Sequence, residues 1–165
     1  MKKAIFLDRD GVLISNKNHY YIWKQDQVEY VDGVFRNLQM LTLKGFQLFI
    51  VSNQGGISRG LYSKNDILKL HEELIRTFQK NNIEISEIVY CPHHPEIEKC
   101  ICRKPDSLMI DKLIAKYNID KEGSYMIGDS ESDMETAQKA GIHGILISPN
   151  QNMYPYISFL LNEQR

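Results

Sequence analysis

Five short apolar runs recur along the chain, and each ends close to a polar or charged residue. Their length and their content of Ile, Val, Leu and Phe are typical of buried β-strands. They cover residues 3–8, 46–51, 86–90, 124–128 and 143–147. We therefore predict five strands.

The segments between these runs carry apolar residues at helical spacing. In the segment 63–81, Ser63 fits the position of an N-cap, and apolar residues follow every three or four positions: Ile67, Leu70, Leu74, Ile75 and Phe78. Helical spacing, or a glycine at the expected end (Gly45, Gly141), predicts further helices at about 32–44, 106–118, 131–140 and 154–163.

Regular alternation of strands and helices favours an α/β fold, with a mainly parallel sheet covered by helices on both faces. In such sheets the ligand site lies at the carboxyl ends of the strands. Asp8, Ser52, Cys91 and Asp129 each fall at or just after a predicted carboxyl end. We expect them to meet at one edge of a single domain covering residues 1–165.

The bulk composition is that of an ordinary globular protein, with 42% hydrophobic and 25% charged residues. A net charge of −1 disfavours nucleic acid as the main partner. No apolar run approaches the roughly 20 residues that span a bilayer, and the apolar start is too short for a signal peptide. We expect a cytoplasmic protein with no membrane contact.

Two acidic clusters stand out. Asp8 and Asp10, followed by Gly11, could place one carboxylate to attack phosphorus and another to protonate the leaving oxygen. Asp129 and Asp133 open a predicted helix, and with the first pair they offer oxygen ligands for Mg²⁺. The competing interpretations are a solvated Asp-Gly turn and helix capping by acids.

Two further groups carry weaker signals. The hydroxyl and backbone N–H groups of Ser52, Asn53 and Gln54 could hold phosphate oxygens, although a loop N-cap explains them equally well. Arg103 and Lys104 precede a predicted helix, and Lys104 could stabilise both a carboxylate and a transferring phosphoryl group. In isolation, this pair fits solvated surface charge better.

Three cysteines and two histidines lie within twelve residues. Cys91, Cys100 and Cys102 with one imidazole match a closed tetrahedral Zn²⁺ shell, which is typical of a structural site. Spacing alone does not choose between His93 and His94. The alternative is three buried free cysteines.

These motifs together resemble the haloacid dehalogenase superfamily. The resemblance rests on Asp8-x-Asp10-Gly11, Ser52, Lys104 and Gly128-Asp129-x3-Asp133, in that order. The Cys-x-His…Cys-x-Cys loop followed by Arg-Lys-Pro resembles the zinc-containing branch, which holds heptose bisphosphate phosphatases and histidinol-phosphate phosphatase domains. The similarity runs from residue 4 to about 147.

The resemblance implies a capless, three-layer α/β/α Rossmann-like fold with the first and fourth strands adjacent. It implies a phosphoric monoester hydrolase in which Asp8 becomes an aspartyl-phosphate and Asp10 is acid, then base. Mg²⁺ would sit on Asp8, the carbonyl of Asp10 and Asp129, with Asp133 in support. Ser52 and Lys104 would stabilise the phosphoryl group. Zn²⁺ would bind the three cysteines and His93.

The resemblance is greatest to the heptose branch, through the segment 52–60 and the segment 90–95. The expected substrate is therefore a small phosphorylated sugar, heptose 1,7-bisphosphate, hydrolysed at its 7-phosphate by a monomer. Arg59 and Arg103 could anchor a second phosphate, with Asn53 and Gln54 as further substrate contacts. The alternatives are histidinol-phosphate phosphatase, a nucleic-acid 3′-phosphatase and a non-catalytic zinc-stabilised module.

Overall fold

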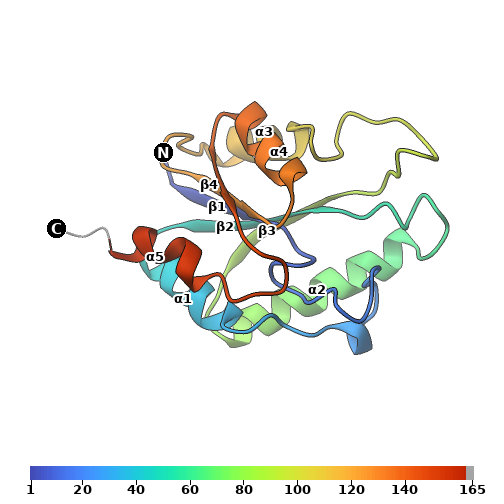
Figure 1. Cartoon of the computed structure of the whole chain (residues 1–165), viewed down its shortest axis with the longest axis horizontal. Coiled ribbons are helices and arrows are strands. Elements are labelled where there is room, and N and C mark those ends of the chain that lie inside the picture. The colour runs from blue at the N-terminus through green and yellow to red at the C-terminus, as the bar shows by residue number, and fades with distance from the viewer. Residues whose placement is uncertain (163–165) are drawn as a thin grey trace.

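The structure, a computed structural model, describes residues 1–162 and contains a five-stranded, entirely parallel sheet (Figure 1). The strand order is β3-β2-β1-β4-β5. The strands are β1 (Ala4–Leu7), β2 (Gln47–Asn53), β3 (Ile85–Cys91), β4 (Tyr125–Gly128) and β5 (His143–Leu146). All five predicted strands are confirmed.

The five predicted helices are also present. They are α1 (Val34–Leu43), α2 (Lys64–Lys80), α3 (Leu108–Tyr117), α4 (Glu131–Ala140) and α5 (Tyr154–Asn162), with a short 3-10 turn at Gln25–Gln27. The predicted end of the last helix, residue 163, lies outside the described residues. None of the helices within residues 1–162 is long and apolar enough to cross a bilayer.

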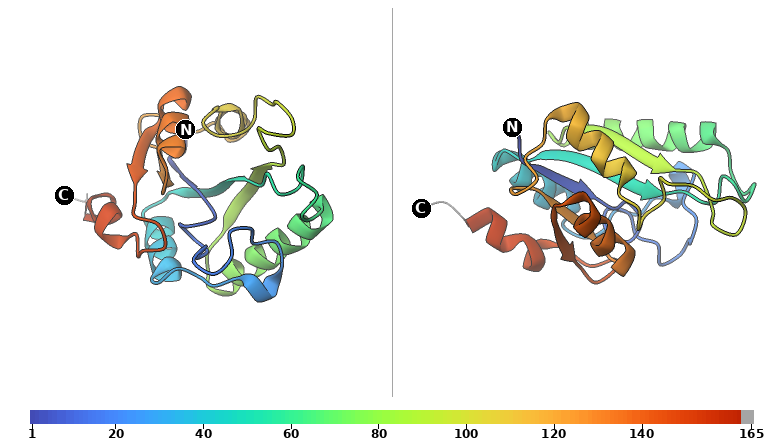
Figure 2. Two further views of the ribbon diagram at one scale, coloured as in Figure 1. Left: turned by 45° about the vertical axis from the view of Figure 1, so that its right-hand side comes forward. Right: turned by 90° about the horizontal axis from the view of Figure 1, so that it is seen from above.

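The helices form a layer on each face of the sheet (Figures 1 and 2). Helices α1, α2 and α5 lie on one face, and α3 and α4 lie on the other. Alternate residues of β1 supply the two cores: Ile5 and Leu7 pack with the first group of helices, and Ala4 and Phe6 with the second. A strand buried on both faces must be apolar throughout, which explains its unbroken apolar sequence.

Local signals set several helix ends where they were expected. Ser63 caps α2 by accepting a hydrogen bond from the Asp66 backbone N–H, and the Asp66 carboxylate accepts one from Ser63 N–H in return. Gly141 ends α4 with a left-handed φ of 78°, a conformation that a residue with a side chain adopts only under strain.

Some predicted boundaries were wrong. Strand β2 continues to Asn53 and β3 to Cys91, because Ser52 pairs with Tyr90 and Asn53 with Cys91 in register. The backbone ladder continues whatever the polarity of the side chains. Helix α3 begins at Leu108 rather than at 106, since Asp106 closes a turn by donating its backbone N–H to the Arg103 carbonyl and Ser107 is the N-cap.

The topology places two distant acidic segments side by side. After β3 the chain crosses the sheet through α3 and adds β4 on the other side of β1. Leu7 then lies opposite Ile127, so Asp8 and Asp129 emerge at the same edge. Loops, the 3-10 turn and α1 connect β1 to β2, and a loop and α2 connect β2 to β3, so the described residues hold no inserted cap domain. The predicted capless α/β/α fold is confirmed.

Candidate active site

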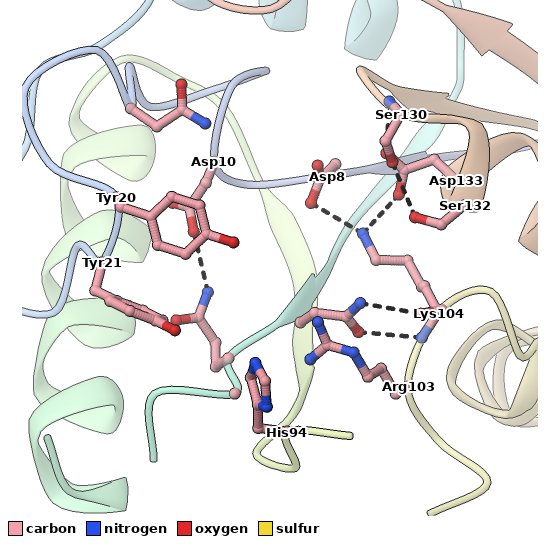
Figure 3. Close-up of a pocket in the computed structure, with 14 residues that line it drawn as sticks. Asp8, Asp10, Tyr20, Tyr21, His94, Arg103, Lys104, Ser130, Ser132 and Asp133 are labelled. Atoms are coloured by element: carbon pink, nitrogen blue, oxygen red, sulfur yellow. Dashed lines mark hydrogen bonds and ion pairs between the residues drawn. The ribbon is translucent and has the colours of Figure 1, made fainter. Parts of the chain in front are cut away.

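A polar pocket opens at the carboxyl ends of the strands (Figure 3). Loops and strand ends from most of the chain contribute to it. Its lining comprises Asp8, Asp10, Asn16, Tyr20, Tyr21, Asn53, Gln54, Gly55, His94, Arg103, Lys104, Ser130, Ser132 and Asp133. Of the four residues predicted to meet at this edge, Asp8 lines the pocket, Asp129 lies beside Asp8 in a group of carboxylates, Ser52 is buried, and Cys91 belongs to the cysteine and histidine group.

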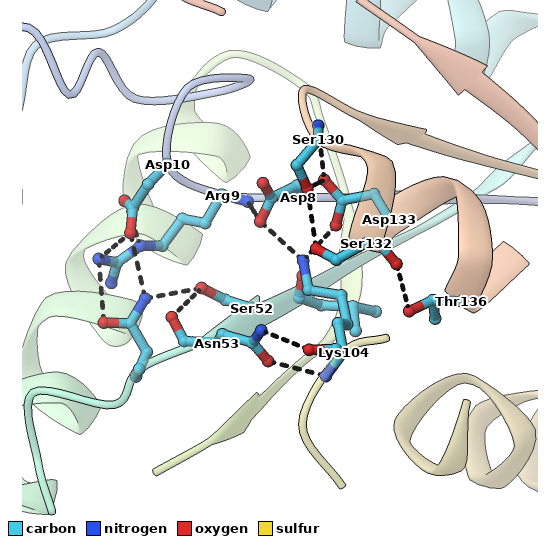
Figure 4. A network of polar contacts seen from close by, with 12 residues as sticks. Asp8, Arg9, Asp10, Ser52, Asn53, Lys104, Ser130, Ser132, Asp133 and Thr136 are labelled. Atoms are coloured by element: carbon cyan, nitrogen blue, oxygen red, sulfur yellow. Dashed lines mark hydrogen bonds and ion pairs between the residues drawn. The ribbon is translucent and has the colours of Figure 1, made fainter. Parts of the chain in front are cut away.

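A buried ammonium group joins two carboxylates on one side of this pocket. Lys104 Nζ lies 2.9 Å from Asp8 Oδ1 and 2.7 Å from Asp133 Oδ1, and it also donates to the Val51 carbonyl (Figure 4). Burial by itself would lower the pKa of Lys104, but the two carboxylates outweigh it and raise the pKa. Lys104 is therefore a fixed positive charge against Asp8.

The pKa of Asp8 is raised well above its ordinary value. Burial is the main cause; Lys104 opposes it, while Asp133 and Asp129 reinforce it. Burial also raises the pKa of Asp129. Three carboxylates thus share one ammonium group, an excess of negative charge that a divalent cation would balance.

The carboxylates of Asp8, Asp129 and Asp133 each offer an oxygen within 4.8 Å of the others. Asp133 is already occupied, because its Oδ2 accepts from the backbone N–H and hydroxyl of Ser130 while its Oδ1 faces Lys104. Asp8 and Asp129 are the freer pair. This cluster of hard oxygen donors suits Mg²⁺.

Gly11 allows Asp129 to approach the first acidic segment. A Cβ atom at Gly11 would lie 2.1 Å from Asp129 Oδ2, and the residue has a left-handed φ of 86°. The left-handed φ favours glycine here, and the absence of a Cβ atom leaves room for the Asp129 carboxylate. The turn after β1 and the end of β4 are therefore in direct contact.

Asp10 faces the pocket but is held from behind by its neighbour in sequence. Arg9 Nε donates to Asp10 Oδ1 at 2.8 Å, and Arg9 Nη2 donates to Asp10 Oδ2 at 3.0 Å (Figure 4). Arg9 is fully buried, whereas 22% of the Asp10 side chain remains exposed. Sequence reasoning assigned no role to Arg9, since the position between two acids resembles a solvated turn.

The residues at the end of β2 support other groups in the site. The Asn53 amide clamps Lys104, with Oδ1 accepting from Lys104 N–H at 3.1 Å and Nδ2 donating to its carbonyl at 3.2 Å. Gln54 Nε2 donates to Ser52 Oγ at 2.6 Å and to Asp10 Oδ2 at 3.3 Å. Ser52 is buried beneath the pocket. The predicted contacts of Ser52, Asn53 and Gln54 with substrate remain predictions.

The two predicted anchor arginines lie in different places. Arg103 lines the pocket and donates to the His93 carbonyl at 3.0 Å. Arg59 is exposed outside the pocket lining, where its Nη1 lies 3.4 Å from the Tyr21 hydroxyl. Tyr20 stands at the mouth with 81% of its surface exposed, in edge contact with Tyr21.

The predicted zinc ligands converge. Cys91, His93, Cys100 and Cys102 each offer a ligand atom within 4.8 Å of the others, and His93 Nδ1 is 3.4 Å from Cys91 Sγ and 3.2 Å from Cys102 Sγ. His94 instead lines the pocket, which separates the two histidines. Burial raises the pKa of Cys91, whereas backbone N–H groups of Arg103 and Cys102 outweigh burial and lower the pKa of Cys100 to about 7.

Several pocket or supporting residues were not expected from sequence. Ser130 and Ser132 lie at the start of α4, where Ser130 is the N-cap. Asn16 donates its backbone N–H to Asn150 Oδ1 and accepts a hydrogen bond from Asn150 Nδ2 at its Oδ1. The motif spacing carried no signal for Tyr62 or His71, because they approach from a different element. Only the folded chain brings them to the site.

Comparisons with known proteins identify the family of this chain. A family model described as HAD-hyrolase-like matches residues 101–153. The D-glycero-alpha-D-manno-heptose-1,7-bisphosphate 7-phosphatase of Campylobacter jejuni is 40% identical over 149 residues, which cover 90% of this chain and 83% of that protein. The Histidine biosynthesis bifunctional protein HisB of Legionella pneumophila is 33% identical over 165 residues, covering all of this chain but 47% of that protein.

A solved structure is also similar. The D,D-heptose 1,7-bisphosphate phosphatase from B. bronchiseptica, complexed with magnesium and phosphate, superposes with a TM-score of 0.82. It is 27% identical, and the match covers 95% of this chain and 86% of that one. The chain belongs to the heptose-1,7-bisphosphate 7-phosphatase family of haloacid dehalogenase-type phosphoric monoester hydrolases.

Proposed function

We propose that this protein removes the 7-phosphate of D-glycero-D-manno-heptose 1,7-bisphosphate. The observation that carries the proposal is Asp8, placed at the end of β1 with Lys104 Nζ 2.9 Å from its Oδ1, inside a pocket lined by cationic and hydroxyl groups. The 40% identity to a heptose bisphosphate phosphatase supports the choice of substrate.

The site residues divide the chemistry between them. Asp8 Oδ attacks phosphorus, and the bond from phosphorus to the sugar oxygen breaks as Asp10 gives that oxygen a proton. In the second half, Asp10 takes a proton from water, the water oxygen bonds to phosphorus, and the bond from phosphorus to Asp8 breaks. Inorganic phosphate leaves, and Lys104 offsets negative charge in both halves.

Asp8, Asp129 and the backbone carbonyl of Asp10 would hold Mg²⁺, with Asp133 in support. The excess of carboxylates over ammonium groups around Asp8 fits a divalent cation. When bound, the ion supplies charge neutralisation that lets an anionic carboxylate approach an anionic phosphate. The chain's own residues keep Asp8 aimed at the pocket.

Cys91, His93, Cys100 and Cys102 would hold Zn²⁺ as a structural ion. Four protein donors leave no open position for catalysis. His93 Nε2 faces Glu98 Oε1 at 3.8 Å, the kind of outer partner that orients a ligating imidazole through its second nitrogen. The ion would order the loop that leads directly into Arg103 and Lys104.

Histidinol phosphate is the second candidate, because the match to the histidine biosynthesis protein covers the whole chain. An amine-bearing substrate calls for a carboxylate that is free to pair with it. The acids that line the pocket are Asp8, Asp10 and Asp133, and each has a cationic partner within residues 1–162. His94 and Arg103, which also line the pocket, instead favour a second anionic group. We further propose a cytoplasmic monomer.

The test is a comparison of kcat/KM on heptose 1,7-bisphosphate and on histidinol phosphate with Mg²⁺ present. We expect kcat/KM to be at least about a hundredfold higher for the bisphosphate. A substrate that leaves charged groups of the site without partners binds with a large loss of free energy. A preference for histidinol phosphate would overturn the substrate assignment. Equal, very slow turnover of both would overturn it as well.

A further inference from the structure

Arg9 is a charged side chain with no exposed surface, so every donor on its guanidinium group needs an internal partner. Two donors hold the Asp10 carboxylate. Arg9 Nη2 also donates to the Ile22 carbonyl at 2.6 Å and lies 3.3 Å from Gln54 Oε1. The remaining nitrogen, Nη1, lies 3.1 Å from His71 Nε2.

His71 reaches this group from the middle of α2 and is not among the residues that line the pocket. The side chain is buried, and its ring packs edge-on against Tyr90 of β3 with 5.6 Å between ring centroids. Burial, and then the positive charge of Arg9, lowers the pKa of His71 to about 3, so the imidazole is neutral. Its unprotonated Nε2 accepts the hydrogen bond from Arg9.

A second arm of the same network runs through Gln54. Tyr62, also buried, donates from its hydroxyl to Gln54 Oε1 at 2.8 Å, and Gln54 Nε2 lies 3.3 Å from Asp10 Oδ2. Asp10 therefore accepts three hydrogen bonds, all from buried donors. A carboxylate held by a bidentate guanidinium and an amide keeps one plane and one rotamer.

We propose that Arg9 and His71 are positioning residues which hold the Asp10 carboxyl group in line with the leaving oxygen. Helix α2 thereby controls the geometry of proton transfer without touching the substrate. The inference rests on the proposed function, in which Asp10 is the general acid and base. His71 orients Arg9, and Arg9 orients Asp10.

The chemistry of the leaving group can separate this role from general stability. In the first half-reaction the bond from phosphorus to the leaving oxygen breaks, and Asp10 transfers its proton to that oxygen. A sugar alkoxide needs this proton, whereas 4-nitrophenolate is a stable leaving group without it. A misplaced Asp10 should slow hydrolysis of the sugar phosphate more than hydrolysis of the aryl phosphate, because general acid catalysis contributes about 10²–10⁴-fold to the rate.

The experiment measures kcat/KM for heptose 1,7-bisphosphate and for 4-nitrophenyl phosphate in His71→Leu, His71→Gln and Arg9→Lys. In His71→Leu and Arg9→Lys we expect kcat/KM to fall about tenfold or more for the sugar phosphate, which is a part of the general acid contribution. For the aryl phosphate we expect kcat/KM to fall less than about threefold. Lysine keeps the charge but cannot form the bidentate fork. In His71→Gln, the amide oxygen can accept the hydrogen bond from Arg9. This variant should therefore retain most of the activity on the sugar phosphate that His71→Leu loses.

Two controls make the outcome decisive. Glu72→Gln alters the exposed neighbour of His71 on α2 and should leave both rates unchanged. Asp10→Asn should show the same selective loss, to a greater degree; if it does not, the acid role of Asp10 in the proposed function fails. If Asp10→Asn is selective but His71→Leu and Arg9→Lys slow both substrates equally, or neither, the positioning role is refuted. Thermal melts of each variant identify loss of fold.

Discussion

Lys104 and Asp8 show that two side chains of the same site can differ in how well their charged forms are compensated. Lys104 is buried and Asp8 keeps 14% of its side chain exposed, and burial by itself disfavours the charged form of each. Lys104 keeps its charge because two carboxylates surround it. Asp8 has one ammonium partner and two acidic neighbours, so its ionised form is poorly compensated when no metal is bound.

Replacement of Asp8 by Asn should therefore have two separable effects. Turnover should fall on the order of 10⁴-fold or more, because the nucleophile is removed. The metal-free protein should become more stable at neutral pH. A carboxyl group whose folded pKa is raised contributes stability below its unfolded pKa, near 3.8, and that stability is lost as pH rises through the folded pKa. Asparagine, which stays neutral, avoids the loss.

Steady-state kinetics and melting curves in chelator at pH 5 and pH 8 would test both effects. The stabilisation by Asp8→Asn should be larger at pH 8 than at pH 5. Asp26→Asn, an exposed acid in the 3-10 turn, is the matched control and should change neither quantity. Full activity in Asp8→Asn would disprove its role as nucleophile.

At the scale of elements, the loop between β3 and α3 contains no helix or strand over residues 92–107, and Ile97 and Ile101 are exposed. The four convergent side chains at its base link its two ends, together with the hydrogen bond from Arg103 to the His93 carbonyl. A loop of this length is costly to order by backbone contacts alone.

Zinc should be present at about one ion per chain and should hold this loop. Cys100→Ser should reduce the zinc content, increase amide hydrogen exchange across residues 92–104 and lower kcat, because Lys104 lies at the end of the loop. Elemental analysis and hydrogen-exchange mass spectrometry measure these changes. His94→Gln, adjacent in sequence to the ligand His93, should retain zinc. Carefully purified, reduced protein without zinc would rule out this role for the loop.

At the scale of the whole molecule, the site depends on the crossing of the chain from β3 to β4. Strand β1 lies at the centre of the sheet, with β2 on one side and β4 on the other. Asp8 comes from the N-terminal half and Asp129 from the C-terminal half. An ion bound to both would connect two parts of the chain that separate when the protein unfolds.

Mg²⁺ should therefore raise the stability of the whole molecule by mass action. At a concentration about 100 times its dissociation constant, the gain is about 2.7 kcal/mol, seen as an increase in Tm. Asp129→Asn should abolish most of this increase, and Asp26→Asn should leave it intact. A Tm shift that persists in Asp129→Asn would place the ion elsewhere. Calorimetric melts with and without MgCl₂ provide the measurement.

The sequence by itself determined most of the framework. Buried strands must be apolar and helices amphipathic, so all five strands and five helices could be located, with errors of one or two residues at some ends such as those of β2 and α3. The acids that converge at the site and the three cysteines of the loop were also identified, because their chemistry requires particular residue types at short spacing; spacing did not decide between His93 and His94.

Only the tertiary structure decided how the site is supported. Arg9, His71 and Tyr62 belong to a buried hydrogen-bond network whose members lie up to 62 residues apart, and no local pattern records such a pairing. It also separated His93 from His94 and showed Asn53 and Gln54 holding Lys104 and Asp10. The physical reason is that hydrogen bonds between side chains depend on position and direction in space, whereas secondary structure depends on periodicity along the chain.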